Sequence, residues 1–255
     1  TSRRQHSTKA AVYDDEKSIT GQGRTNAHRG ATFLDVGGYS SRPGAADIPE
    51  DLETKRSAAA IAIILKHFPG ALISVDTFRS HVARACVQNG AAMVNDISGG
   101  LLDVDMLATV ARLRVPYVLM HMRGTPQTMN QQTHYEHLIK DVLDYFHDRV
   151  AACRAAGLFD IIIDPGFGFA KTSDQNYELL QQLPLLRPIE RPVMAGVSRK
   201  SMIWKTLGIT PEEALNGTTA LHMLALLGGA SILRAHDVKQ AAEAITLFQH
   251  YRAAR

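Results

Sequence analysis

The sequence predicts an α/β protein built on a parallel sheet with crossover helices. From residue 31 onward, short apolar runs alternate with longer amphipathic runs, and turn residues separate the two kinds. The interiors of the short runs are almost continuously apolar, as expected for strands that are covered on both faces. Seven such β-then-α units in 255 residues favour a (β/α)8 TIM barrel over an open doubly wound sheet.

Seven strands and six long helices are expected from this alternation. The strands span residues 31–37, 71–76, 92–96, 116–122, 160–164, 192–197 and 230–235. The helices span residues 50–68, 79–89, 135–156, 174–186, 211–227 and 237–253. The second and third of these helices end at glycines, a common helix stop signal.

The first of the eight units is not evident in the sequence. Residues 8–19 are a helix candidate, residues 21–24 read as a break, and residues 1–30 contain no apolar strand run. The stretch 20–29 is interpreted as too broken for a regular crossover helix. Because a barrel closes only with all of its strands, either a strand upstream of Thr1 lies outside this sequence or the barrel is open there. We therefore treat 1–255 as one barrel domain, with 1–30 as an irregular or incomplete first unit.

Composition excludes two classes of partner. The 28 Lys and Arg and 25 Asp and Glu residues give a net charge of +3, and the charges are interspersed, unlike the basic stripe of a nucleic-acid-binding protein. The most apolar stretch, roughly residues 218–233, contains His222 and two glycines and is shorter than the roughly 20 residues needed to cross a bilayer. The two cysteines, Cys86 and Cys153, are too few to staple the fold and favour a reducing, cytoplasmic setting.

Each apolar run ends in a polar or charged residue. In a (β/α)8 barrel the carboxyl ends of the strands build the active site. Asp76 and Asp164 end apolar strands, so their carboxylates need partners, and a ligand rich in N–H groups would supply them. Asn95 can donate and accept, which suits the edge of a heterocycle, although a turn amide is the alternative. A single aspartate is often a helix cap, but a whole ring of polar strand ends favours a binding site.

Cations follow the last two strands. Arg234 and His236 lean to one side of the pleat and form a candidate anion site, with an ion pair between Arg234 and a carboxylate as the alternative. Asp237 is expected to cap the helix that follows. Lys200 lies at the same mouth, where it could bind an anion or a heterocycle oxygen.

Two loops rich in glycine add further candidates. Turn residues in segment 37–44 would hold Arg42 over the mouth, and Phe167 and Phe169 are candidate stacking faces. His121 is interpreted as a packed interior histidine, since no second histidine lies at a metal-ligand spacing.

With these residues in place, the chain resembles the dihydropteroate synthase family from about residue 30 to its end. SSRPG, DPGFGF and SRK are the specific motifs, whereas DVGG and NDI are shared with other pterin-binding barrels. The matching strings are DVGGYSSRPGA (35–45), SVDT (74–77), NDISGG (95–100), LMHMRGTPQTM (119–129), DPGFGFAK (164–171), VSRKS (197–201) and LRAHDV (233–238).

The resemblance implies a transferase of folate biosynthesis. Such an enzyme condenses 6-hydroxymethyl-7,8-dihydropterin pyrophosphate with p-aminobenzoate to give 7,8-dihydropteroate and pyrophosphate. It implies catalytic roles for Asp76, Asp164, Lys200 and Arg234. By substrate, it assigns Asp76, Asn95, Asp164 and Lys200 to the pterin, Ser41, Arg234 and His236 to the pyrophosphate, and Arg42, Pro43, Phe169 and Ser198 to p-aminobenzoate.

The resemblance also implies Mg²⁺, competition by sulfonamides, and a homodimer formed through helices near the C-terminus. The family's first strand carries an Asn that binds Mg²⁺ together with pyrophosphate. Residues 1–30 contain no match to that segment, so no metal-binding residue can be named.

Three other interpretations remain open from the sequence. A pterin-dependent methyltransferase module would use the same barrel, but SSRPG and SRK argue against it. A non-catalytic pterin-binding or regulatory protein is favoured only by the absence of a recognisable first strand. A plain structural domain is the third.

Overall fold

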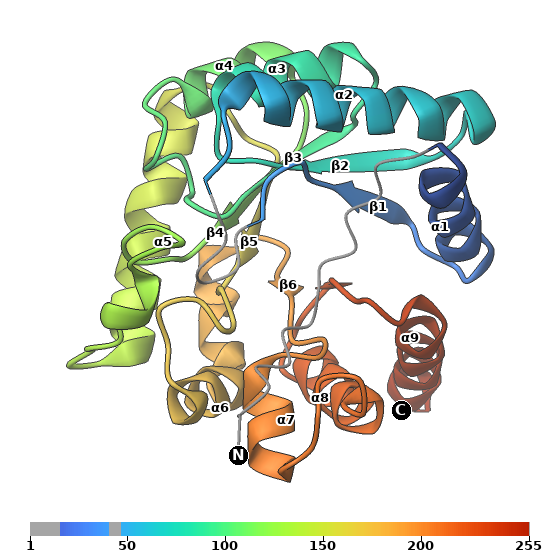
Figure 1. The fold of residues 1–255 in the computed structure, drawn as a ribbon. Helices are drawn as coiled ribbons and strands as arrows, with labels where there is room; N and C mark the ends of the chain where they lie inside the picture. Colours follow the sequence, from blue (N-terminus) through green and yellow to red (C-terminus); the bar gives the residue numbers. More distant parts are fainter. Residues whose placement is uncertain (1–15, 41–46, 255) are drawn as a thin grey trace, which may run out of the picture.

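A computed structural model of the chain describes residues 16–40 and 47–254. Parallel strands form a curved central sheet, and helices surround it (Figure 1). The strands are β1 Phe33–Val36, β2 Leu72–Asp76, β3 Met93–Asp96, β4 Tyr117–Met120, β5 Ile161–Asp164, β6 Met194–Ala195 and β7 Ile232–Leu233. The helices are α1 Glu16–His28, α2 Glu50–His67, α3 Ser80–Gln88, α4 Met106–Leu113, α5 Leu138–Ala155, α6 Ser173–Gln181, α7 Ser201–Leu207, α8 Leu215–Leu227 and α9 Val238–Ala253. Two 3₁₀ helices are η1 Met129–Gln131 and η2 Leu183–Ile189.

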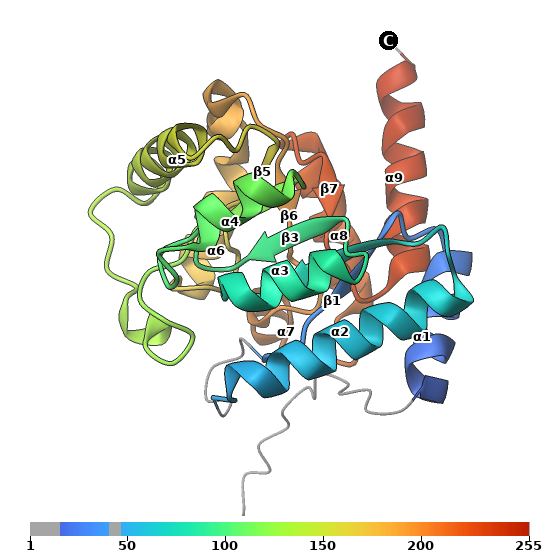
Figure 2. The ribbon, with the colours of Figure 1, turned by 90° about the horizontal axis from the view of Figure 1, so that it is seen from above.

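The order of the strands in space follows their order in the chain. Strands β1 to β5 form one parallel sheet, and β6 pairs in parallel with β7. A parallel bridge between Ile163 and Val193 joins the two sets at β5 and β6. This sequential arrangement, with helices outside, is that of the predicted barrel, and each expected strand is present (Figure 2).

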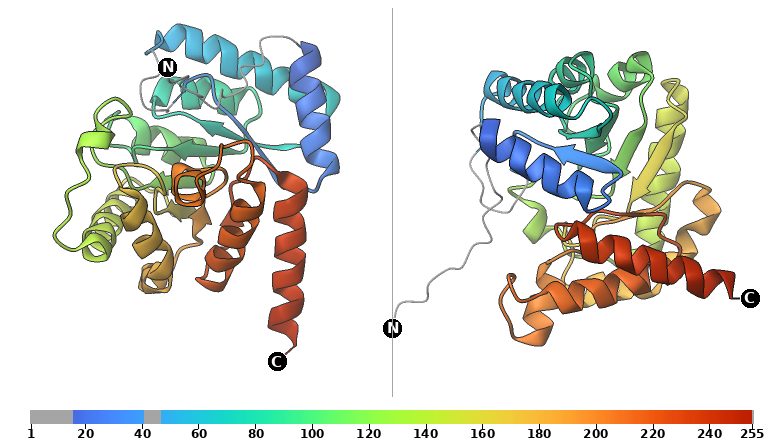
Figure 3. Two further views of the ribbon diagram at one scale, coloured as in Figure 1. Left: turned by 60° about the horizontal axis from the view of Figure 1, so that its bottom comes forward. Right: turned by 90° about the vertical axis from the view of Figure 1, so that its right-hand side faces the viewer.

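The barrel has a seam between β7 and β1. No strand occupies this position within residues 16–40 and 47–254, which agrees with the absence of a recognisable first strand in the sequence. Helices α1 and α9 both lie on the outside of this part of the barrel, with α9 beginning close to the end of α1 (Figure 3), and a Cβ atom on Gly30, just after α1, would be 3.6 Å from Cβ of Ala242 in α9. The turn after α1 therefore packs against α9 beside the seam.

The expectation of a break in segment 20–29 is wrong. Helix α1 continues through Gly21 and Gly23 to its last residue. Glycine costs about 1 kcal/mol in a helix, but here tertiary packing outweighs that cost. A Cβ on Gly23 would be 3.6 Å from the ring of Phe68, so the helix packs closely against the end of α2. Residues 8–15 of the expected helix lie outside the described residues.

Other helix boundaries also differ from expectation. The short helices α4 and α7 were not anticipated, and the expected helices 135–156 and 211–227 begin later, at Leu138 and Leu215. The expected helix 174–186 ends at Gln181, and a 3₁₀ segment follows. Pro184 and Pro188 lack the N–H groups that would continue an α-helix there.

The core has two layers. Inside the barrel, apolar side chains from the consecutive strands β3 to β6 pack together and fill the interior; they are Met93, Val118, Ile162 and Met194. A larger cluster lies between the sheet and the helices and includes Phe146 of α5. None of the described helices has the length and apolarity to cross a lipid bilayer.

Replacing Phe146 with Ala should lower the free energy of unfolding by about 3–5 kcal/mol, because its ring is fully buried and its removal leaves a cavity. Phe159→Ala is the control, since Phe159 is 69% exposed and should change stability by less than about 0.5 kcal/mol. Urea denaturation of both variants measures the difference. Equal effects of the two substitutions would contradict this description of the core.

Candidate active site

Charged side chains from distant strands meet at the carboxyl end of the barrel. Arg234, just after β7, donates from Nε to Asp35 Oδ2 and from Nη2 to Asp76 Oδ2, each at 2.7 Å. Asn95 Nδ2 donates to the same Asp35 oxygen at 3.2 Å. The register explains this meeting, because Asp76 of β2 lies directly beside Asn95 of β3. Side chains from β1, β2, β3 and the end of β7 thus share one polar cluster.

The second half of the site lies around Gly196, after β6. A Cβ atom there would be 3.6 Å from Lys200 Nζ, 3.8 Å from Asp164 Oδ2 and 3.9 Å from Arg234 Cβ. These three side chains therefore converge on the space that a residue larger than glycine would fill. Lys200 donates to the carbonyl oxygen of Phe167, and Asp164 Oδ1 accepts from the amide of Gly166 at 2.8 Å.

Burial moves the pKa values of two of these groups, Asp76 and Lys200, towards 7. It raises the pKa of Asp76 to about 7, opposed by Arg234 and assisted by Asp35. It also raises the pKa of Asp164, opposed mainly by Lys200. Burial lowers the pKa of Lys200 to about 8, and Asp164 opposes that shift. Clusters of groups perturbed in this way are typical of functional sites.

Ser198 and His236 lie together on the loops after β6 and β7. His236 Nδ1 is 3.1 Å from Ser198 Oγ, and the backbone N–H of His236 donates to that oxygen at 3.2 Å. Arg199 and Asp237 form a two-point ion pair beside them, at 2.7 and 2.9 Å. Asp237 occupies the N-cap position of α9 as expected, but its carboxylate binds Arg199 and makes no capping hydrogen bond.

The two phenylalanines of the loop after β5 have different environments. Phe169 is half-buried, and Lys200 Nζ lies 4.9 Å from the centre of its ring. Phe167 is fully buried in the main core, so its expected role as a stacking face is wrong. The sequence of a glycine-rich loop does not predict which of its side chains point into the core.

The predicted site residues in the described part of the chain come together at one mouth. They are Asp76, Asn95, Asp164, Phe169, Ser198, Lys200, Arg234 and His236. Ser41, Arg42 and Pro43 lie outside the described residues. The alternative of an ion pair for Arg234 is also observed, with Asp35 as the first partner. Sequence reasoning left Asp35 without a role, although its position at the end of the first apolar run was a usable signal.

Asp96 follows Asn95 at the same strand end, but its carboxylate is turned away from this cluster. It accepts hydrogen bonds from the Ser98 amide and hydroxyl, the Gly100 amide and the Tyr117 hydroxyl, at 2.6 to 2.8 Å. These four donors satisfy a fully buried carboxylate. Asp96 therefore holds the loop after β3 in place.

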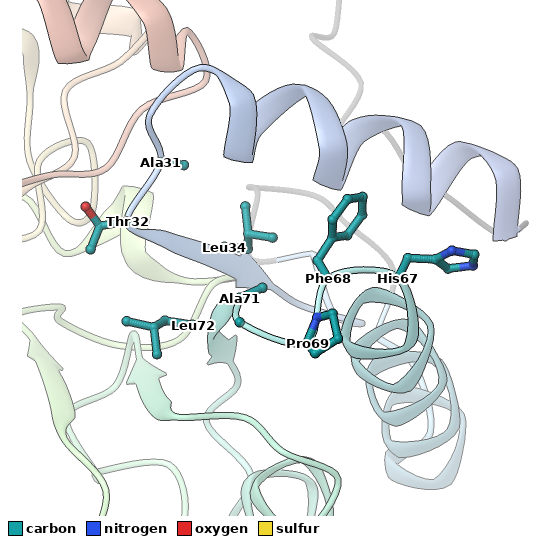
Figure 4. Close-up of a pocket in the computed structure, with 9 residues that line it drawn as sticks. Ala31, Thr32, Leu34, His67, Phe68, Pro69, Ala71 and Leu72 are labelled. Carbon is teal, nitrogen blue, oxygen red and sulfur yellow. The ribbon is translucent and has the colours of Figure 1, made fainter.

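The described residues do not bring three metal-binding side chains of the His, Cys, Asp or Glu type together. A cavity of about 440 Å³ lies at the opposite end of the barrel, between the start of β1 and the end of α2 (Figure 4). Leu34, Phe68, Pro69 and Leu72 are among its lining residues, and none of the strand-end polar groups reaches it. That end of such barrels serves stability.

A barrel whose mouth gathers carboxylates, an amide and cations has the architecture of a pterin-binding enzyme, and the model of the family described as "Pterin binding enzyme" matches residues 5–236. A dihydropteroate synthase of Synechocystis sp. is 43% identical over 225 residues, which cover 87% of this chain and 78% of that one. The Escherichia coli (strain K12) dihydropteroate synthase is 39% identical, covering 86% and 78%. The chain belongs to the dihydropteroate synthase family and is a transferase.

Solved structures of the family have the same fold. A Yersinia pestis dihydropteroate synthase in complex with a sulfonamide drug superposes with a TM-score of 0.91 at 33% identity, covering 95% of this chain and 88% of that one. A Xanthomonas albilineans dihydropteroate synthase with 4-aminobenzoic acid gives 0.87 at 38% identity, covering 93% and 85%. The TIM-barrel class predicted from the sequence, a (β/α)8 fold, is confirmed by these matches.

Asp96→Asn should lower the free energy of unfolding by about 2–4 kcal/mol, because an amide cannot accept from four donors at once. Asp105→Asn is the control, since Asp105 is exposed and makes no side-chain cap to α4. Urea denaturation compares the two variants. A change below about 0.5 kcal/mol for Asp96→Asn would show that this carboxylate is not structural.

Proposed function

We propose that this chain condenses 6-hydroxymethyl-7,8-dihydropterin pyrophosphate with p-aminobenzoate, giving 7,8-dihydropteroate and pyrophosphate. The observation that carries the proposal is the convergence of Asp76, Asn95, Asp164, Lys200 and Arg234 on one mouth. Membership of the dihydropteroate synthase family supports it. The residue roles below follow from the chemistry of these groups.

The pterin ring is assigned to the space around Asp164, Asn95 and Lys200. The amino-pyrimidinone edge of a pterin is rich in N–H donors and resembles a guanidine, so carboxylate oxygens suit it. Asn95 supplies a further donor and acceptor, and Lys200 supplies a donor for a ring oxygen or nitrogen. Because Asp164 is 5% exposed, a bound pterin would replace little water around it and bring hydrogen bonds in exchange.

The pyrophosphate is assigned to Arg234 and His236, with Ser41 as a third contact. Arg234 faces two carboxylates, and a dianionic or more highly charged leaving group would compete for its guanidinium. In the proposed reaction the carbon–oxygen bond to pyrophosphate breaks first and leaves a pterin methyl cation. The amine of p-aminobenzoate attacks that carbon and then loses a proton.

Each charge that develops in this reaction has a group nearby to stabilise it. The carboxylates of Asp76 and Asp164 offset the cation, and Arg234 and His236 stabilise the departing pyrophosphate. Phe169 and Ser198, with Arg42 and Pro43, are assigned to p-aminobenzoate, so that the amine is held beside the reacting carbon. The Lys200 ammonium next to the Phe169 ring brings the two substrate sites together.

Mg²⁺ is proposed to arrive with the diphosphate. Mg²⁺ keeps several waters and takes few protein oxygens when it binds phosphates, which suits a mouth without a three-residue metal cluster in its described part. The ion would neutralise charge on the diphosphate oxygens. No protein ligand is assigned to it.

The remaining proposals concern partners and location. Sulfonamides would compete with p-aminobenzoate at its site. The chain would form a homodimer through α8 and α9, whose exposed Leu224, Leu227, Leu247 and Tyr251 provide apolar surface. A cytoplasmic location is supported by the free thiols of Cys86 and Cys153.

The activity is tested by mixing the chain with dihydropterin pyrophosphate and measuring pyrophosphate release with and without p-aminobenzoate. Release should depend on p-aminobenzoate and match dihydropteroate formation mole for mole. Tight pterin binding without release would favour a non-catalytic pterin-binding protein. Methyl transfer from a methylated pterin cofactor, with no release of pyrophosphate, would favour a methyltransferase.

Asp164→Asn should lower kcat/KM at least about 100-fold at neutral pH, because an amide carries no charge to offset a cation and replaces one of the two acceptor oxygens with a donor. Asp160→Asn is the matched control, since Asp160 precedes the same strand at the opposite end of the barrel and is exposed. Steady-state rates of pyrophosphate release compare the two. An unchanged kcat/KM for Asp164→Asn would refute the assignment.

A further inference from the structure

A buried lysine lies beneath the loop that carries Asp164 and Phe169. Lys171 is 8% exposed, and its Nζ donates to the carbonyl oxygens of Gly166 and Phe169, each at 3.1 Å. Its third neighbour is Nδ1 of His121, at 3.0 Å. An ammonium has three N–H groups, and three acceptors surround it here.

His121 is a rigidly held hydrogen-bond partner for this lysine. It is 1% exposed, and the edge of its ring meets Tyr145 at a centroid distance of 4.8 Å. Its backbone is fixed as well, since the His121 N–H donates to the Asp164 carbonyl oxygen at 2.9 Å. Burial, with Lys171 and Arg123 adding to the effect, holds the pKa of His121 well below its usual range. The ring is therefore neutral, and Nδ1 accepts while Nε2 carries the hydrogen.

The loop depends on this support because its backbone is unusual. Gly166 has a φ of +71°, and a Cβ there would lie 2.0 Å from the His121 carbonyl oxygen. Ala170 also has a positive φ of 50°. Lys171 binds two carbonyl groups of the loop from below, while Lys200 binds that of Phe167 from the mouth. The two lysines together hold the loop on which Asp164 and Phe169 depend.

The Lys171 charge has no close counterion. In the described ranges, no carboxylate lies within 4.0 Å of its Nζ. Burial lowers the pKa of Lys171 to about 7, Asp164 opposes that shift, and Lys200 and Arg123 add to it. In return, the Lys171 charge helps to lower the pKa of Asp164. A buried ammonium without an ion pair is costly, and a structural role alone would be served by an uncharged donor.

We propose that Lys171, held in place by His121, is a positioning residue for the pterin: it fixes the loop from Asp164 to Phe169 through two carbonyl groups and adds a positive charge to the surroundings of Asp164. This inference rests on the proposed function, because it assumes that Asp164 binds the pterin. Lys171 itself does not touch the substrate in this account.

Two substitutions remove the charge of Lys171 and differ in how much of its hydrogen bonding they keep. Lys171→Gln keeps a neutral donor for the loop carbonyls, and Lys171→Met keeps only the side-chain length. The pH profile of kcat/KM for dihydropterin pyrophosphate is the readout. Without the positive charge the pKa of Asp164 rises, so the acid limb of the profile should move to higher pH in both variants. A shift of one pH unit corresponds to about a tenfold loss on that limb.

The direction of the pH effect follows from the two titrations. Wild-type Lys171 is charged below pH about 7 and loses its charge above it. Its charge therefore lowers the pKa of Asp164 only below about pH 7. The loss in Lys171→Gln should therefore be largest below pH 7 and shrink at higher pH. A loss equal at every pH, or no loss at all, would overturn the inference. Lys55→Met, on the exposed face of α2, is the matched control.

A second pair of variants keeps the inference testable if Lys171→Met does not fold. His121→Leu removes the acceptor at Nδ1 and should shift the acid limb in the same direction as Lys171→Gln. His121→Asn offers an amide oxygen to Lys171 and should restore the wild-type profile at least in part. Identical pH profiles of kcat/KM for His121→Leu and the wild type would show that His121 does not hold Lys171 in place.

Asp164→Asn separates this inference from the function on which it rests. If that variant retains wild-type kcat/KM, the proposed function fails. If it loses activity while Lys171→Gln and Lys171→Met keep the wild-type pH profile, only the role of Lys171 fails. Calorimetric titration with 6-hydroxymethylpterin across the same pH range reports binding without turnover and should show the same shift.

Discussion

The mouth of this barrel depends on mutual neutralisation of charges that arrive on different strands. Arg234 holds Asp35 and Asp76 together across the seam between β7 and β1, and Asn95 joins them from β3. Removing any one of the charged, partly exposed groups would leave a charged partner without its counter-charge. The register of β2 and β3 places Asp76 beside Asn95. The absence of a side chain at Gly196 leaves room for Asp164 and Lys200 next to Arg234.

The same groups account for binding and for chemistry. In the free protein the carboxylates and cations are paired with one another, whereas a charged, N–H-rich ligand offers each of them a partner of its own. Burial raises the pKa of Asp76 to about 7 and lowers that of Lys200 to about 8, so a ligand that pairs with the charged form of either group stabilises that form. Lys171 adds a further, buried cation that binds two carbonyl groups of the loop after β5.

The sequence was most informative where local pattern decides structure. Strands covered on both faces are continuous apolar runs, so each strand and the polar residue after it could be located. The path of α1 could not, because Gly23 is tolerated only through its contact with Phe68, which is far away in the sequence. The inward turn of Phe167 and the pairing of Asp237 with Arg199 likewise depend on tertiary neighbours. For Arg234 the sequence left an anion site and an ion pair as alternatives, and the structure contains the ion pair at the position of the proposed anion site.

The central claim is that one mouth binds a pterin ring and a diphosphate. A crystal structure of the chain with 6-hydroxymethylpterin and pyrophosphate tests it most directly. The account predicts the amino edge of the pterin within about 3 Å of Asp164 and Asn95, with the diphosphate on Arg234. A pterin found instead in the cavity at the opposite end of the barrel, between Leu34 and Phe68, would contradict it.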